Sequence, residues 1–216
     1  MAANPKWCQP LSRWKEYFKG WIINAEPKEL MEFNVFFDFR IVAGEKALEQ
    51  DLRSAISGML VDRPRFFAQA AQHALQFKAP IRLFGAIVDP KAGSEHPGQL
   101  DLKAAAMPII TFARLYALKE QMAETNTLAR LEELARKGIL LPSKQQEIAL
   151  AYETLLRLRL RHQAATLRAG REPDNWVTPD FLGHIEEALL RECFKEVENI
   201  QNLLQREFLG SAPQIK

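Results

Sequence analysis

The sequence lacks the residues and patterns on which several classes of protein depend. Its two cysteines, Cys8 and Cys193, are far apart and do not have metal-ligand spacing, so we expect two reduced thiols and no zinc site. No apolar run approaches the roughly 20 residues of a membrane span. The N-terminus also lacks the basic-then-apolar profile of a signal peptide. These absences predict a cytoplasmic protein.

An excess of charge of one sign is missing as well. The chain has 29 Lys and Arg against 27 Asp and Glu, which gives a formal net charge of +2. This balance does not favour nucleic acid or an anionic membrane as a partner. Any surface that binds an anion must therefore be local.

What the sequence does contain is helical periodicity over most of its 216 residues, 47% of which are hydrophobic. Apolar residues recur at spacings of three and four from Trp7 to Trp21, and Pro27 suits the first position of a second helix. The last helix is expected to begin with Thr178 as its N-cap and to end near Phe208. Between these, helices are expected over 44–62, 63–77, 104–123, 127–137 and 143–169.

One break interrupts the helical pattern. The runs PIRLFGAIV and GQLDLK are short and β-prone, and they flank a loop with glycine, proline and serine. They predict a small hairpin over about 80–103. The fold class that we expect is therefore mainly α, a helical bundle with one small β-hairpin.

Three charged residues share helical sectors with apolar residues. Asp38 falls on the face of Phe33, Arg114 lies beside Leu118, and Arg159 lies between two leucine stripes. An unpaired buried charge costs several kcal/mol, so each of the three needs a partner or a ligand. A closed structural network and a ligand-binding cleft both meet that need.

The 143–169 helix carries the most informative arginines. Two stripes are expected to be packed, and the sector between them is expected to be enclosed. The first stripe contains Ile148, Ala151, Leu155, Leu158, His162 and Ala165; the second contains Leu156, Leu160 and Leu167; the sector between them contains Tyr152, Arg159 and Gln163. The other arginines, Arg157, Arg161 and Arg168, are expected to be solvated and to pair with acids of the last helix such as Glu186 and Glu187.

Six ordered segments carry a resemblance that spans nearly the whole chain. They are MAANPKWCQPLSRWKEYFKGWI, FFDFRIVAGE, LDLKAAAMPIITFARLYAL, TNTLARLEEL, LRLRLRHQ and DNWVTPDFL. They resemble the putative nucleotidyltransferase substrate-binding domain, a C-terminal domain of bacterial signalling proteins with cyclic-nucleotide-binding, CBS and nucleotidyltransferase modules. The resemblance implies three regions: a linker helix at 1–24 like the end of a preceding nucleotidyltransferase domain, a helical substrate-binding domain at 25–210, and a tail at 211–216.

The resemblance implies a helical domain that presents an acceptor, a protein or a small molecule, to a catalytic partner domain, as in enzymes related to protein uridylyltransferases. Nucleotidyl transfer needs a glycine-led phosphate loop and a carboxylate pair for two metals, and the sequence contains neither this loop nor a D-x-D pair. Glu196 and Glu198 have the spacing, but on a helix they diverge by about 200°. We expect no catalytic residues, metal ligands or cofactor in this chain. Magnesium and a nucleoside triphosphate would belong to the catalytic partner.

The polar residues of the matching segments form the candidate substrate-binding set. They are Asp38, Arg40, Asp101, Lys103, Arg114, Arg159, His162 and Gln163. We expect several of them to line one polar cleft, in which arginines bind an anionic group and Asp38 orients one of them.

Two alternatives belong to other functional classes. Arg157 and His162 fit the R-x4-6-H pattern of HEPN-like helical RNA-binding or RNA-cleaving domains, although the two side chains differ by about 140° in helical phase. A dimerisation or regulatory module is the second alternative. If Trp7, Trp14 and Trp21 formed an apolar surface left by a missing catalytic domain, a homodimer would cover it.

Overall fold

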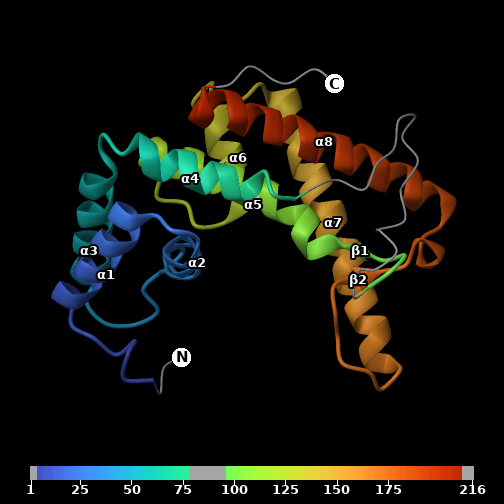
Figure 1. The fold of residues 1–216 in the computed structure, drawn as a ribbon, viewed down its shortest axis with the longest axis horizontal. Helices are drawn as coiled ribbons and strands as arrows, with labels where there is room; N and C mark the ends of the chain where they lie inside the picture. The colour runs from blue at the N-terminus through green and yellow to red at the C-terminus, as the bar shows by residue number, and fades with distance from the viewer. Residues whose placement is uncertain (1–3, 78–95, 211–216) are drawn as a thin grey trace.

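The structure, a computed structural model, describes residues 4–77 and 96–210. Within those ranges it is mainly α-helical with one two-stranded antiparallel sheet, which confirms the expected fold class (Figure 1). The elements are α1 (Leu11–Asn24), α2 (Pro27–Phe36), α3 (Lys46–Leu60), α4 (Pro64–Ala74), β1 (Leu100–Asp101), α5 (Leu102–Lys119), α6 (Thr127–Arg136), α7 (Pro142–Arg168), β2 (Trp176–Val177), the 3-10 turn η1 (Pro179–Phe181) and α8 (His184–Leu209).

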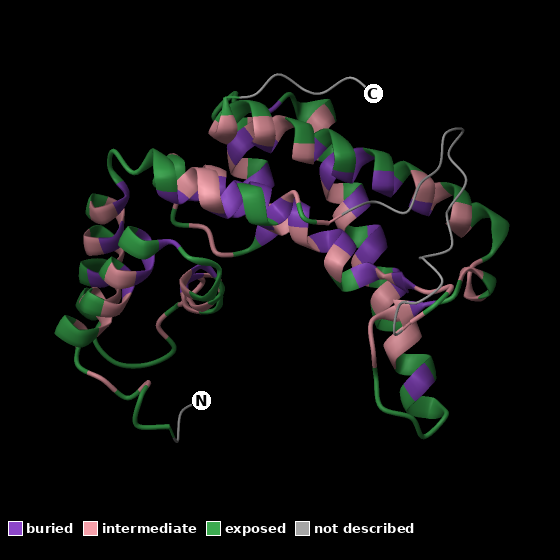
Figure 2. Cartoon of the chain, in the orientation of Figure 1, coloured by how far each residue is buried: buried purple, intermediate pink, exposed green. Residues whose placement is uncertain are grey.

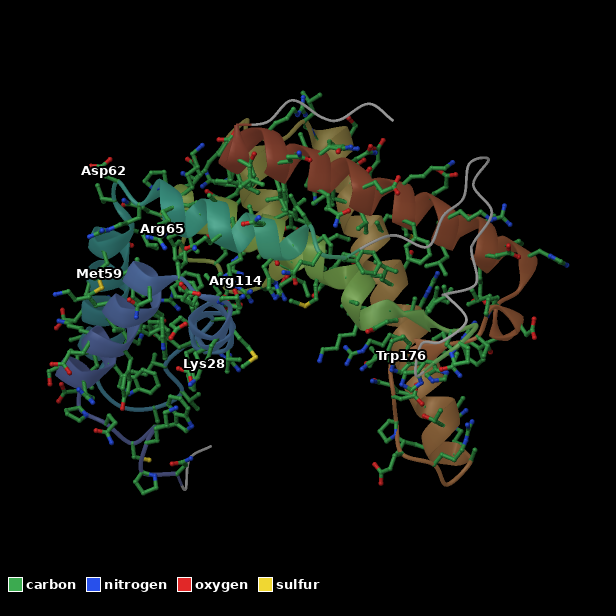
Figure 3. The ribbon with its side chains drawn as sticks, viewed as in Figure 1. Lys28, Met59, Asp62, Arg65, Arg114 and Trp176 are labelled. Carbon is green, nitrogen blue, oxygen red and sulfur yellow. The ribbon has the colours of Figure 1, made fainter. Side chains whose placement is uncertain are left out.

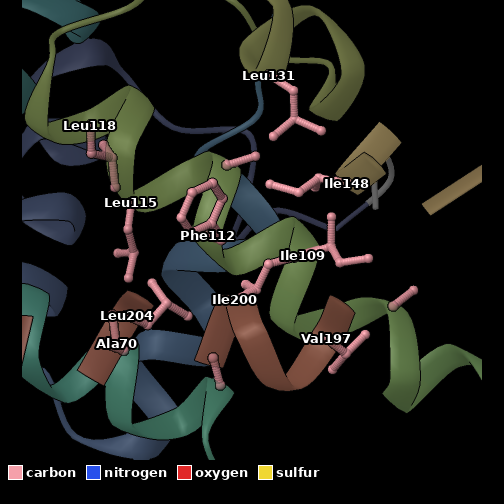
Figure 4. Close-up of a cluster of buried hydrophobic side chains, with 14 of the residues drawn as sticks. Ala70, Ile109, Phe112, Leu115, Leu118, Leu131, Ile148, Val197, Ile200 and Leu204 are labelled. Atoms are coloured by element: carbon pink, nitrogen blue, oxygen red, sulfur yellow. The ribbon is translucent and has the colours of Figure 1, made fainter. Parts of the chain in front are cut away.

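Helix α5 is the centre of the body that α4 to α8 form. Its apolar residues surround the axis almost completely, so it can pack against α4, α6, α7 and α8 at once. Figure 4 shows Phe112 and Ile109 of α5 next to Ile148 of α7 and Ile200 of α8, all fully or almost fully buried. This shared core fixes the positions of the helices that carry the polar residues.

Helices α1, α2 and α3 lie together at one end of the body, opposite the end formed by the sheet and the last turns of α7 (Figure 1). An aromatic cluster holds α1 on α2. The ring of Phe36 lies 4.3 Å from Trp7, 5.2 Å from Trp14 and 5.7 Å from Trp21, measured between centroids. Trp21 is buried, and the other two tryptophans are partly buried. The tryptophans therefore pack within their own chain and do not form the exposed surface that the dimer alternative required.

The sheet pairs segments that are far apart in the sequence. Leu100 lies opposite Val177 and Asp101 opposite Trp176. The second predicted hairpin strand, which contains β1, thus pairs with β2 in the segment that follows α7. The first predicted hairpin strand, 80–88, lies outside the described residues.

Two details of the sequence prediction are wrong. The segment after Thr178 forms only η1, and α8 begins at His184 with Gly183 as its N-cap. The first turn of α8 is closed by Glu186, whose carboxylate accepts the N–H of Gly183 at 3.2 Å. The second leucine stripe of α7 is not packed either, because Leu160 and Leu167 are 61% and 59% exposed. In Figure 2 the last turns of α7, which extend past the other helices of the body, are coloured mainly as exposed or intermediate.

None of the described helices combines the length and the low charge that are needed to cross a membrane.

Candidate functional site

The structure places five of the predicted polar residues in two clusters, and the other three belong to neither. Helix α5 shows how far apart the predicted residues lie, since Asp101 precedes its first turn and Arg114 lies 13 residues further on. At 1.5 Å per residue these positions are about 20 Å apart along the axis. Figure 3 shows Arg114 near the middle of the molecule and Trp176, the β-sheet partner of Asp101, in the separate part beside α7. The prediction of one shared cleft is therefore wrong.

The first cluster, here called the buried arginine pair, contains Arg114, Arg130, Asp38 and Asn34. Arg114 Nη1 donates to Asn34 Oδ1 at 2.8 Å, and Nη2 donates to Asp38 Oδ2 at 2.6 Å. Arg130 donates to the other carboxylate oxygen of Asp38, and its Nε donates to the carbonyl of Glu124 at 2.8 Å. The pair thus joins the segment after α2 to α5 and α6.

Burial and charge act in opposite directions at this cluster. Burial alone raises the pKa of Asp38, but its hydrogen bonds and ion pairs with Arg130 and Arg114 outweigh this effect and hold the pKa below its usual value. Arg114 and Arg130 are 6% and 1% exposed. The inward position predicted for Arg114 is confirmed, whereas Asp38 is only half-buried, with 26% of its side chain exposed. The geometry of the two residues is that of an internal network.

Sequence reasoning missed Arg130. The signal that could have found it is its helical phase, because Thr127, Arg130, Leu131 and Leu134 recur at i, i+3, i+4 and i+7 and are all buried.

The second cluster, here called the α7–β2 cluster, contains Arg159, His162, Gln163, Asp174 and Asn175. The Oδ1 atom of Asn175 accepts from Arg159 Nε at 2.6 Å and from Gln163 Nε2 at 3.2 Å. The Oδ1 atom of Asp174 lies 2.8 Å from His162 Nε2 and accepts the backbone N–H of Trp176 at 2.8 Å. Positions 162 and 163 are each about one helical turn from position 159, so the three side chains of α7 can all reach the loop before β2.

Among the described residues, no acid forms an ion pair with Arg159. Within residues 4–77 and 96–210, its Nη1 and Nη2 also make no hydrogen bond. Asp174 is engaged by the Trp176 N–H and by His162. Burial alone raises the pKa of Asp174, but these contacts outweigh burial and hold the pKa below its usual value. Arg159 is half-buried and not fully shielded, contrary to the expectation. A fixed guanidinium with two free NH2 groups is suited to bind an oxyanion.

The remaining predicted residues have more ordinary positions. Asp101 Oδ1 accepts the N–H of Ala104 at 2.9 Å and so acts as the N-cap of α5. Lys103 is exposed in the first turn of the same helix. Arg40 is exposed and belongs to neither cluster.

The arginines on the outer face of α7 are solvated as predicted, but among the described residues only Arg161 forms the predicted ion pair with an acid of α8. Arg157, Arg161 and Arg168 are exposed. Arg161 pairs with Glu186, and its Nη2 donates to Glu186 Oε2 at 2.8 Å. His162, in contrast, is half-buried against Asp174 and Phe181. Arg157 and His162 thus face different surroundings, which removes the geometric basis for an R-x4-6-H site.

Sequence reasoning also missed Asp174 and Asn175, because their roles depend on contact between a loop and a helix.

No three His, Cys, Asp or Glu side chains in the described part of the chain converge as metal ligands would.

Comparison with protein families gives two matches on this chain. Residues 64–208, which contain α4 to α8, match the family described as "Putative nucleotidyltransferase substrate binding domain". Residues 1–28, which contain α1, match the family described as "Putative nucleotidyltransferase DUF294". No curated protein and no solved structure matches the chain. The larger match includes both Arg114 and the whole α7–β2 cluster.

Proposed function

Because the chain belongs to the putative nucleotidyltransferase substrate-binding domain family, we propose that it holds an acceptor for a nucleotidyltransferase catalytic domain and does not itself transfer the nucleotide. The match of residues 1–28 to a nucleotidyltransferase family supports a physical connection to such a domain. The matched helix, α1, is packed on α2 through the aromatic cluster around Phe36, and it also packs on α3. A catalytic domain joined to α1 would therefore be held on this part of the molecule.

The observation that carries the proposal is that the guanidinium of Arg159 is held in place but only partly hydrogen-bonded. Asn175 orients its guanidinium from one side, while Nη1 and Nη2 make no hydrogen bond within the described residues. Arg114 and Arg130 are buried and already bind the carboxylate of Asp38. The α7–β2 cluster is thus better suited than the buried arginine pair to contact an acceptor. Arg159 is the residue that would bind the acceptor's anionic group, and Gln163 and Lys103 are further polar contacts.

The finer parts of the proposal rest on the sequence resemblance. The domain is compared with the helical domains of enzymes that uridylylate or adenylylate regulatory proteins, which makes a protein acceptor and a signalling role part of the proposal. The nucleotide and Mg²⁺ are assigned to the catalytic partner, where a metal pair can stabilise the phosphoryl oxygens.

The test combines the purified chain with a separately purified catalytic domain of the matched nucleotidyltransferase family. Each labelled nucleoside triphosphate is supplied with Mg²⁺ and a protein extract as the source of acceptor. We expect label on an acceptor only when both proteins are present. Arg159→Met should reduce this label, whereas Arg168→Met, which removes an exposed charge from the same helix, should not.

Incorporation by the chain alone, stopped by EDTA, would show that it is catalytic and would refute the proposal. Equal labelling with wild type and Arg159→Met would remove the α7–β2 cluster from the acceptor site.

A further inference from the structure

The buried arginine pair has more positive charge than its partners neutralise. Arg114 and Arg130 share the single carboxylate of Asp38, so the three side chains together carry one excess positive charge. Arg114 Nε and Arg130 Nη1 are also buried without a hydrogen-bond partner in the described part of the chain. A buried cation and buried N–H donors are both costly when unpaired, so this arrangement favours an additional anion nearby.

A third arginine lies close to the pair and lines a surface pocket. The pocket is formed by α3 and the segment that follows α5, and its lining includes Arg53, Ser54, Ser57, Phe37 and Met122. Arg53 donates from Nε to Glu49 Oε1 at 2.9 Å and from Nη2 to the carbonyl of Phe39. Its Nη1 makes no hydrogen bond within residues 4–77 and 96–210 and remains available.

Two pocket residues also contact or adjoin the arginine pair. The guanidinium carbon of Arg130 lies 5.8 Å from the ring centroid of Phe37, which lines the pocket. Ala123, another lining residue, precedes Glu124, whose carbonyl accepts from Arg130 Nε. The charges also interact: burial lowers the pKa of Arg130, the bond to Asp38 raises it, and repulsion by Arg114 and Arg53 lowers it further.

We propose that this pocket binds a phosphate group, with Arg53 as the direct cationic donor and the hydroxyls of Ser54 and Ser57 as neutral donors. Arg114 and Arg130 supply a positive potential behind Phe37 without leaving Asp38. Serine hydroxyls and guanidinium N–H groups are common phosphate ligands, and Nη1 is the group that Arg53 has available. The site is separate from the α7–β2 cluster and does not depend on the proposed function.

Phosphate in this pocket would link two parts of the molecule. Arg53, Ser54 and Ser57 belong to α3, whereas Met122 and Ala123 belong to the segment that precedes α6.

The test is a phosphate titration of the full chain, followed through the Nε–H signals of its arginines by NMR, with chloride at equal ionic strength as the reference. We expect the Arg53 and Arg130 signals to shift saturably with phosphate and not with chloride. Arg53→Met should weaken this binding by about tenfold or more, the effect of losing one charge-assisted hydrogen bond. Arg65→Met is the matched control, because Arg65 is exposed and does not line the pocket.

Because Arg53→Met also breaks the ion pair with Glu49, a second variant is needed. Ser57→Leu fills the pocket without a change of charge, and it should weaken phosphate binding with the Arg53–Glu49 pair intact. Unchanged titrations in Arg53→Met and Ser57→Leu, or no saturable shift in the wild type, would overturn the proposal. Shifts confined to Arg159 would place the anion at the α7–β2 cluster and would equally refute this pocket.

Discussion

At the scale of single residues, Asp38 has the largest structural role among the predicted polar side chains. Its two oxygens each bind a different arginine, one from α5 and one from α6. A carboxylate in this position neutralises part of a buried positive charge, so its loss leaves two cations together. This geometry favours the structural interpretation of Asp38 among the two that the sequence left open.

Replacement of Asp38 by Asn should lower the free energy of unfolding substantially. Breaking a buried ion pair by removing one partner costs on the order of 3 kcal/mol. Asp51→Asn is the control, because Asp51 is exposed on α3. Chemical denaturation of both variants at neutral pH measures the difference. An equal, small effect of both substitutions would contradict the structural role.

The lowered pKa of Asp38 leads us to expect that the free energy of unfolding depends on pH. The folded protein holds the pKa of Asp38 below the ordinary value of 3.8, so the folded state stabilises the ionised form. This stabilisation is present above pH 3.8 and is lost as the pH falls through the lowered pKa. We expect the difference in unfolding free energy between wild type and Asp38→Asn to shrink as the pH is lowered from 5 to about 2. A constant difference over that range would show that the charge of Asp38 is not responsible.

At the scale of secondary-structure elements, the sequence predicted best where local chemistry decides. Pro27 begins α2 as expected, and α4 and α7 begin at Pro64 and Pro142, each within one residue of the expected start. Gly138, with φ of 73°, follows the end of α6. The start of α8 was misplaced because the Thr178–Pro179–Asp180 signal also suits a short 3-10 turn. In the structure Phe181 of η1 packs on His162 of α7. Helical phase carries no information about such a contact between two segments.

The cap of α5 gives a prediction for a single element. Asp101 accepts the N–H of Ala104, so Asp101→Ala should destabilise the protein by about 1 kcal/mol, whereas Asp101→Ser should retain most of the stability. Thermal unfolding compares the two variants. If both lose the same stability, the charge or the β1–β2 pairing, and not the cap, accounts for the role of Asp101.

At the scale of the whole molecule, helical phase identified inward-facing side chains but could not say which of them meet. Asp38 and Arg114 are 76 residues apart and are in contact. Asp101 caps the helix that contains Arg114, but the two residues are not in contact, because about 20 Å of helix separates them. Helical periodicity likewise could not predict that Asn175, in the loop before β2, accepts a hydrogen bond from Arg159. The grouping of the predicted residues therefore required the three-dimensional fold.

The contacts of α1 lead to a prediction about assembly. Trp21 is 5% exposed, its Nε1 donates to Glu32 Oε2 at 2.9 Å, and its ring stacks on Phe36. Deletion of residues 1–24 would uncover the aromatic faces of Phe33 and Phe36 on α2. An exposed apolar patch of this kind promotes association.

We therefore expect light scattering to give a mass near 24.7 kDa for the full chain and a larger, concentration-dependent mass for the chain without residues 1–24. Deletion of residues 1–6, which leaves Trp7 and α1 in place, is the control and should not change the mass distribution. A full chain that is already a stable dimer would restore the dimerisation alternative. A monomeric deletion variant would show that α1 is not needed to cover α2, so that its aromatic face could bind a separate catalytic domain.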